Sequence, residues 1–212
     1  MGAEVLPFLG VAAILAVTPG PDMALVARNA LVAGRAAVPV TVAGICAGIV
    51  VHVLAAAIGL SALLKASAEA YAVVKILGGA YLVWLGIQAW RASLSDEGDE
   101  NWMLGVARRF AGGSAFSQGF ISNVLNPKLI VFFISVLPQF TTDEGSFFAQ
   151  VLVLGLAFEL LTVLWLVSYG LFVARVGQAM RHPRVRHVLE RISGTVLIAL
   201  GLQVAIDGGR DL

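Results

Sequence analysis

Long apolar runs alternate with short polar segments along the whole chain. Each run contains the roughly 20 mostly apolar residues that a helix needs to cross a bilayer. The pattern predicts an all-α membrane protein whose six transmembrane helices lie at about Val5–Ala27, Ala36–Leu64, Tyr71–Trp90, Ala115–Phe140, Phe147–Ala174 and Val188–Ile206. These helices leave no room for a soluble domain, so we expect residues 1–212 to form a single transmembrane domain.

Composition supports a membrane location. Of the 212 residues, 59% are hydrophobic and only 13% are charged, whereas soluble domains carry roughly 25% charged residues. A soluble fold of this length could not bury so much apolar surface in one core, so lipid is the expected surrounding. The net charge of +1 gives no reason to expect nucleic acid as a partner, and the single Cys46 excludes an intramolecular disulfide.

Basic residues are distributed unevenly between the two predicted sides. Ten of the 14 fall in or beside the segments that join helices one to two, three to four and five to six: Arg28, Arg35, Arg91, Arg108, Arg109, Arg175, Arg181, Arg184, Arg186 and Arg191. The positive-inside rule makes these segments cytoplasmic. We therefore expect both termini to be extracytoplasmic, and residues 93–113 to form a charged cytoplasmic connector. A docking role for that connector is the alternative.

The two halves of the chain share a weak internal repeat. Gly79, Gly86 and Gln88 match Gly194, Gly201 and Gln203 at an offset of 115 residues. Further matches, at offsets of 107 and 106, pair Gly48 with Gly155, His52 with Glu159, Pro21 with Pro127, and Asp22 with Lys128. Repeat one covers about residues 1–92 and repeat two about 114–212.

Three helices per repeat is an odd number, so the second repeat would cross the membrane in the opposite sense. The chain is thus predicted to contain two inverted three-helix repeats, an arrangement common in secondary transporters, with a binding site near the midplane. Accidental similarity between two apolar halves is the alternative.

Prolines interrupt predicted helices one and four. Pro19 and Pro21 cannot donate backbone hydrogen bonds, so they free the carbonyls of Leu15 and Val17, and Pro127 frees that of Asn123 in the same way. Free carbonyls at membrane depth are tolerated where protein or a hydrated cavity satisfies them. Two broken helices at matching positions therefore predict one shared site, unless they are packing kinks without ligand contact.

Charged side chains sharpen this hypothesis. Asp22, Lys128 and Glu159 lie within predicted spans, where each charge needs a partner or water. A zwitterionic amino acid offers an ammonium for Asp22 and the freed carbonyls, and a carboxylate for Lys128, Asn126 or a helix N-terminus. An ion pair between Asp22 and Lys128 is the alternative.

His52 and Glu159 occupy equivalent positions in the two repeats. Histidine titrates near neutral pH, and intramembrane carboxyls can also exchange protons, so the two form a candidate proton-coupling pair. A histidine that only makes a hydrogen bond is the other interpretation.

Motifs typical of several enzyme classes are absent from the sequence. The chain has no Gly-x-x-x-x-Gly-Lys-Ser/Thr phosphate loop, no His-Glu-x-x-His and no nucleophile elbow. We therefore expect neither an enzyme nor a cofactor. No metal site is predicted either.

The ordered motifs of the chain resemble the LysE/RhtB amino-acid exporter family. Similar segments are Thr18-Pro19-Gly20-Pro21-Asp22, Gly78-Gly79-Ala80-Tyr81-Leu82, Asn123-Val124-Leu125-Asn126-Pro127-Lys128, Pro138-Gln139-Phe140 and Ile192 to Gly201. The resemblance implies an exporter of small amino acids or their derivatives in the bacterial inner membrane, driven by the proton-motive force through alternating access. It also implies a homodimer, and the sequence is more similar to the threonine- and homoserine-exporting branch.

Candidate substrate-binding residues come from the two breaks: Thr18, Pro19, Gly20, Pro21, Asp22, Asn123, Asn126, Pro127 and Lys128. Two other functions stay open at this point. One is an ion or heavy-metal efflux protein on the same scaffold, against which the scarcity of cysteine and histidine argues. The other is a non-transporting membrane subunit whose intramembrane charges only pair its helices.

Overall fold

A computed structural model describes residues 2–92, 94, 113–142, 145–176 and 183–210. Every regular element within these ranges is helical, as predicted. The elements are α1 (Gly2–Val17), α2 (Pro21–Val32), α3 (Ala37–Ala66), α4 (Ala68–Ala92), α6 (Ala115–Val124), α7 (Pro127–Val131), η1 (Phe132–Val136), η2 (Leu137–Phe140), α8 (Phe147–Val176) and α9 (Pro183–Arg210). Of these, η1 is a π-helix and η2 a 3₁₀-helix. The predicted connector, residues 93–113, lies almost entirely outside the described residues.

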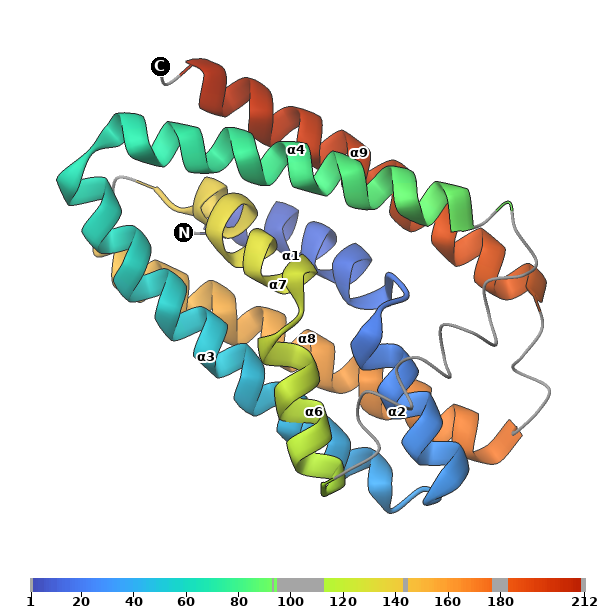
Figure 1. Ribbon diagram of the computed structural model, residues 1–212. Helices are drawn as coiled ribbons and strands as arrows, with labels where there is room; N and C mark the ends of the chain where they lie inside the picture. Colours follow the sequence, from blue (N-terminus) through green and yellow to red (C-terminus); the bar gives the residue numbers. More distant parts are fainter. Residues whose placement is uncertain (1, 93, 95–112, 143–144, 177–182, 211–212) are drawn as a thin grey trace.

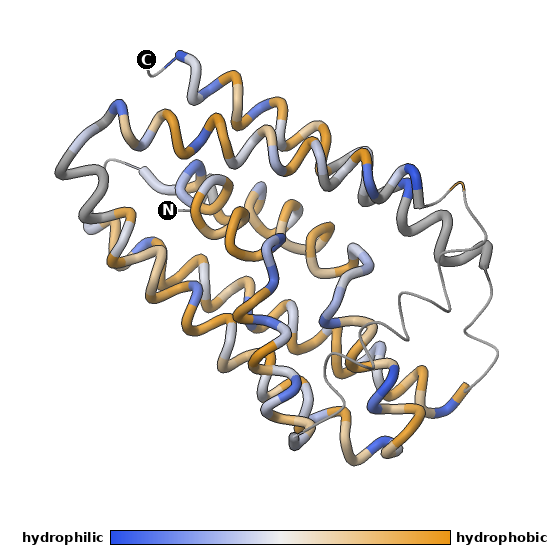
Figure 2. Tube along the Cα trace, in the orientation of Figure 1, coloured by the Kyte–Doolittle hydropathy of each residue, from blue (hydrophilic) through white to orange (hydrophobic). Residues whose placement is uncertain are grey.

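Three described helical segments are long and apolar enough to cross a membrane: Ala37–Leu60, Glu69–Gln88 and Phe147–Val176. Two bent pairs, Val5–Val17 with Pro21–Val32 and Ala115–Val124 with Pro127–Phe140, raise the number to five if each pair is one span. The sixth predicted span falls within α9, and there it stays a prediction. Figure 2 shows hydrophobic residues along most of the helices and a hydrophilic segment between α6 and α7.

The two bends occur at the predicted prolines. The helix axes change direction by 51° between α1 and α2 and by 48° between α6 and the segment Pro127–Phe140. In both cases a proline occupies the first position of the second helix, where its missing N–H is not needed. Asn126 caps α7, because its side-chain oxygen accepts a hydrogen bond from the backbone amide of Lys128 at 3.1 Å. The proline-containing segments are therefore true helix breaks.

Contacts at glycines establish the direction in which neighbouring helices run. Along α3, Gly44 faces Phe116 and Gly48 faces Asn123, so α3 and α6 run in the same direction. Against α8, by contrast, Gly155 contacts Val53 while Gly170 contacts Val38, so α3 and α8 run in opposite directions. Small residues allow the backbones to approach closely where apolar lipid provides no hydrophobic drive.

The α4–α9 pair has two closely matched glycine contacts. Gly79 faces Gly201 and Gly86 faces Gly194, so the two helices are antiparallel. A Cβ atom at any of these glycines would lie 2.5–2.7 Å from the carbonyl oxygen of the facing glycine, closer than real Cβ atoms come. The two helices lie side by side along one edge of the molecule (Figure 1).

Aromatic rings fill the space where α1, η1, η2 and α8 meet. Phe132 lies 6.1 Å from Phe8 and 5.1 Å from Phe158 between ring centroids, and Phe8 lies 5.5 Å from Phe140. Phe133 completes the group through edge contacts with Phe132 and Phe158. We call these five residues the phenylalanine cluster.

Candidate functional site

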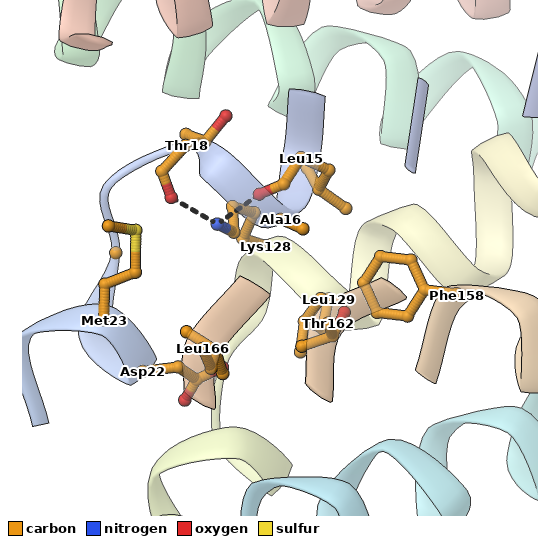
Figure 3. A pocket seen from close by; sticks show the side chains of 11 residues that line it. Leu15, Ala16, Thr18, Asp22, Met23, Lys128, Leu129, Phe158, Thr162 and Leu166 are labelled. Carbon is orange, nitrogen blue, oxygen red and sulfur yellow. Dashed lines mark hydrogen bonds between the residues drawn. The ribbon is translucent and has the colours of Figure 1, made fainter. Parts of the chain in front are cut away.

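The break between α1 and α2 leaves the last carbonyls of α1 without helical donors. Lys128 supplies one: its Nζ donates hydrogen bonds to the carbonyl oxygens of Leu15 and Thr18, both at 3.2 Å. The carbonyl end of a helix carries partial negative charge, which favours a cation there. Figure 3 shows the Lys128 ammonium directed to the end of α1. One of the carbonyls predicted to be free is thus satisfied by a charged side chain of the other half.

Asp22 lies in the first turn of α2, where the partial positive charge of the helix N-terminus favours a carboxylate. Its two oxygens accept hydrogen bonds from Ser122 Oγ at 3.2 Å, Asn123 Nδ2 at 2.9 Å and Asn126 Nδ2 at 3.3 Å. Two of these donors lie in α6, and the third is the cap of α7. The carboxylate therefore contacts both sides of the second break.

His52 is a side-chain partner of the Asn123 carbonyl, which was predicted to be free and which also accepts the backbone N–H of Asn126 at 2.9 Å. Its Nε2 lies 3.0 Å from the oxygen of Asn123 and must carry the hydrogen, because a carbonyl only accepts. The imidazole is 7% exposed and stacks on Phe133 at 5.9 Å. Since the side chain of Asn123 donates to Asp22, a single residue separates His52 from the Asp22 carboxylate.

The two opposite charges line one small cavity without pairing. Among the described residues, no N···O distance of 4.0 Å or less joins Asp22 to Lys128, so the ion pair predicted as the alternative is absent from this conformation. Both residues line a cavity of about 20 Å³ with Thr18, Gly20 and Met23. That volume accommodates about one water molecule, far less than an amino acid.

Helix α8 contributes one wall of this cavity through Phe158, Thr162 and Leu166, which are spaced one turn apart. Thr162 is 6% exposed, and its Oγ1 has no hydrogen-bond partner. Figure 3 shows it on the α8 side of the cavity, near Leu129 and Phe158. The cavity therefore combines two charges, two broken-helix ends and one unpartnered hydroxyl.

A second set of polar side chains joins α2 to α3 and α6, farther from the breaks. Gln118 Oε1 accepts hydrogen bonds from Asn29 Nδ2 at 3.0 Å and from Arg28 at 3.4 Å, and Asn29 Nδ2 also donates to Thr41 Oγ1 at 3.0 Å. Asn29, Thr41 and Gln118 are at most 8% exposed. We call Arg28, Asn29, Thr41 and Gln118 the polar network.

Glu159 lies apart from this arrangement. It is half-buried on α8, beside the thiol of Cys46 on α3. The structure does not bring it to His52, whose contacts are with Asn123 and Phe133. The two candidate proton-coupling residues therefore stand in different surroundings.

The structure brings the other predicted site residues together in two ways. Thr18, Gly20, Asp22 and Lys128 line the cavity, whereas Asn123 and Asn126 reach it through Asp22. Pro19, Pro21 and Pro127 act through the backbone, because they end one helix and begin the next. No group of three or more histidine, cysteine, aspartate or glutamate side chains suited to a metal ion occurs in the described part of the chain.

Two residues of the site were missed from the sequence, Ser122 and Thr162. For Ser122 a signal existed: Gln118, Ser122 and Asn126 are four residues apart, so polar side chains recur on one face of a predicted membrane helix. For Thr162 the signal was weaker: Glu159, three residues earlier, is polar, but Phe158 and Leu166, one turn away on either side, are apolar.

Known proteins match nearly the whole chain. Residues 13–208 match the family model described as LysE type translocator. The homoserine/homoserine lactone efflux protein of Salmonella typhi is 26% identical, over 93% of this chain and 94% of that protein. The threonine efflux protein of Escherichia coli K12 is 27% identical, over 89% of this chain and 91% of that protein. An uncharacterized membrane protein of Bacillus subtilis, YrhP, is 28% identical, over 96% of this chain and 99% of that protein. No solved structure matches the chain.

Proposed function

Since this chain belongs to the LysE type translocator family, we propose that it is a secondary exporter of small neutral amino acids or their derivatives, working by alternating access. Members of the family are membrane transporters, so the chain is a transporter and not an enzyme. The observation that carries the substrate proposal is the cavity in which Asp22 and Lys128 lie at two broken helices without pairing.

The chemistry of this cavity suits a zwitterion. Asp22 and the carbonyls of Leu15 and Thr18 match the ammonium group, and the Lys128 ammonium matches the carboxylate once it leaves those carbonyls. Homoserine, homoserine lactone and threonine stand in the names of the relatives. The names of these relatives support the proposal of a small neutral substrate for this chain.

We further propose six membrane spans arranged as two inverted repeats, with both termini extracytoplasmic. The shared direction of α3 and α6 and the opposed directions of α3 with α8 and α4 with α9 agree with six alternating crossings. The facing pairs Gly79–Gly201 and Gly86–Gly194 exchange places when the repeats are interchanged, which supports the symmetry. The proposed placement is the bacterial inner membrane, and a homodimer remains a prediction.

In this topology α2 and α6 form the cytoplasmic halves of the two broken spans. The polar network joins these halves and would close the route to the cytoplasm. A second cavity of about 460 Å³ lies near the opposite ends, lined in part by Tyr71, Gln139 and Thr142. Because the site itself has room for one water molecule, substrate binding requires the helices to separate.

Proton coupling is the proposed energy source, and the geometry favours His52 over Glu159 as the residue that communicates with the site. His52 bonds to the carbonyl of Asn123, whose side chain holds Asp22. Glu159 has no such link among its contacts, which involve Cys46. Loss of coupling in His52→Gln, measured as uncoupler-insensitive efflux, would support this assignment.

The decisive experiment measures efflux of a mixed pool of labelled amino acids from proteoliposomes, with and without an uncoupler. Wild-type protein should release one or two small neutral amino acids selectively, and an uncoupler should reduce that release. Asp22→Asn should abolish it while the protein still folds. The matched control is Asp207→Asn, which removes a carboxylate paired with Arg210 at 3.7 Å on α9, and this variant should export normally.

Two results would contradict the proposal. Normal export by Asp22→Asn would remove Asp22 from the site. Absence of any amino-acid efflux from well-folded wild-type protein would overturn the exporter assignment.

A further inference from the structure

The Thr162 hydroxyl differs from other threonine hydroxyls in the described helices. Thr41 and Thr195, and also Thr18 directly after α1, each donate to the carbonyl four residues earlier, at 2.8, 2.9 and 2.6 Å. This is the usual way in which a helix satisfies a threonine hydroxyl. Thr162 Oγ1 makes no such bond and is buried without any partner. A buried hydroxyl without a protein partner calls for an explanation, and a role in binding substrate is one.

Its location shows what such a substrate would be. Thr162 lines the same cavity as Asp22 and Lys128 but comes from α8, a helix that carries neither break. Its neighbours along the cavity wall of α8, Phe158 and Leu166, are apolar. A zwitterion held at the breaks would therefore direct its side chain toward an apolar wall with one hydrogen-bonding group.

We propose that Thr162 is a specificity-determining residue whose hydroxyl binds the side-chain hydroxyl of the substrate, so that the exporter selects small hydroxylated amino acids over apolar amino acids of the same shape. This inference rests on the proposed function and deepens it. A substrate hydroxyl would satisfy Thr162, which can both donate and accept.

The site should discriminate against an apolar substrate, because such a substrate gives the Thr162 hydroxyl no hydrogen-bond partner. Valine has the shape of threonine without its hydroxyl, and its binding would keep Thr162 Oγ1 buried and unpartnered. Sites built to bond a substrate hydroxyl reject the analogue that lacks it much more strongly than apolar pockets distinguish a methyl group. The preference should therefore depend on one oxygen atom of the protein.

The test compares export of two isosteric pairs, threonine with valine and homoserine with norvaline, in proteoliposomes containing the full chain. Wild-type protein should prefer each hydroxylated member by about tenfold or more, the factor expected for one hydrogen bond. In Thr162→Val, which keeps the shape and removes the hydroxyl, the threonine-to-valine ratio should fall by about the same factor. Thr162→Ser, which restores a hydroxyl, should keep the preference.

The matched control is Trp165→Phe. The indole Nε1 of Trp165 is also buried without a partner on α8, but Trp165 does not line the cavity. This variant should leave both ratios unchanged.

Each contrary outcome has a distinct meaning. An unchanged threonine-to-valine ratio in Thr162→Val, or an equal loss of both substrates in that variant, would overturn the role of Thr162 in selection. Amino-acid export by wild-type protein without preference for a hydroxyl would overturn this inference and leave the exporter standing. Absence of all amino-acid export would overturn both.

Discussion

On one side of the cavity, α2 meets α3 and α6 through the amide, hydroxyl and guanidinium groups of the polar network, whereas on the other side α1 meets η1, η2 and α8 through the phenylalanine cluster. Most of the side chains on both sides are buried. They differ in the kind of contact that holds the helices together.

Hydrogen bonds within the polar network can be replaced by hydrogen bonds to water, so their net contribution to stability is small. The rings of the phenylalanine cluster have no such replacement, and separating them loses close packing. We therefore expect the α2–α6 side to separate more easily than the other side, and the phenylalanine cluster to contribute more to stability. The predictions below test this difference, from the largest expected effect to the smallest.

Phe132→Ala should lower the free energy of unfolding most, by about 3 kcal/mol, because it removes a ring that contacts three other members of the cluster. Chemical denaturation in detergent micelles would measure the change. Phe172→Ala is the control: that ring, also in a membrane helix, is 50% exposed and should lower stability much less. Equal losses of unfolding free energy in the two variants would contradict a larger contribution of the phenylalanine cluster to stability.

Gln118→Leu should lower the free energy of unfolding by about 2 kcal/mol, because Asn29 and Arg28 each lose one of their two acceptors. Hydrogen exchange of the α2 and α6 amides should also become faster. Gln203→Leu, which replaces an exposed glutamine on α9, is the matched control. It should change neither the free energy of unfolding nor the exchange of the α2 and α6 amides. If exchange instead quickened around η1, the α2–α6 side would not be the easier one to open.

Thr41→Val should lower the free energy of unfolding by about 0.6 kcal/mol, the average for one interhelical hydrogen bond in a membrane. Thr41→Ser should restore most of the loss because the hydroxyl returns. A loss for Thr41→Val as large as that for Phe132→Ala would show that the two sides are equally difficult to open.

Ser122→Ala should have the smallest effect, because Asp22 keeps its bonds from Asn123 and Asn126. We expect a change in unfolding free energy of about 0.5 kcal/mol or less, and export close to wild type in the proteoliposome assay. Loss of export in this variant would mean that the 3.2 Å bond from Ser122 positions Asp22 by itself.

The sequence predicted the helices and their breaks well, because apolar length and proline geometry act locally. Pro19 and Pro127 identified the carbonyls of Leu15 and Asn123 as free, and both carbonyls have unusual side-chain partners in the structure. What sequence spacing could not supply was which side chain reaches them. Lys128 and His52 come from the opposite halves of the chain, and only packing in three dimensions determines their position.

Isolated polar residues inside apolar helices were harder to interpret. Thr41 and Thr162 both lie on long apolar helices, yet one joins the polar network and the other lines the cavity. Local sequence does not separate these roles, because each depends on which neighbouring helix faces the residue. The π-helix at η1 also escaped prediction, since no local residue pattern indicated it.

Two links cross between the helix breaks in opposite directions. Asp22, just after the first break, accepts hydrogen bonds from residues on both sides of the second, and Lys128, just after the second, donates to Leu15 and Thr18 before the first. A bend at either break would stretch a hydrogen bond that is anchored at the other. We therefore expect the two breaks to behave as one mechanical unit.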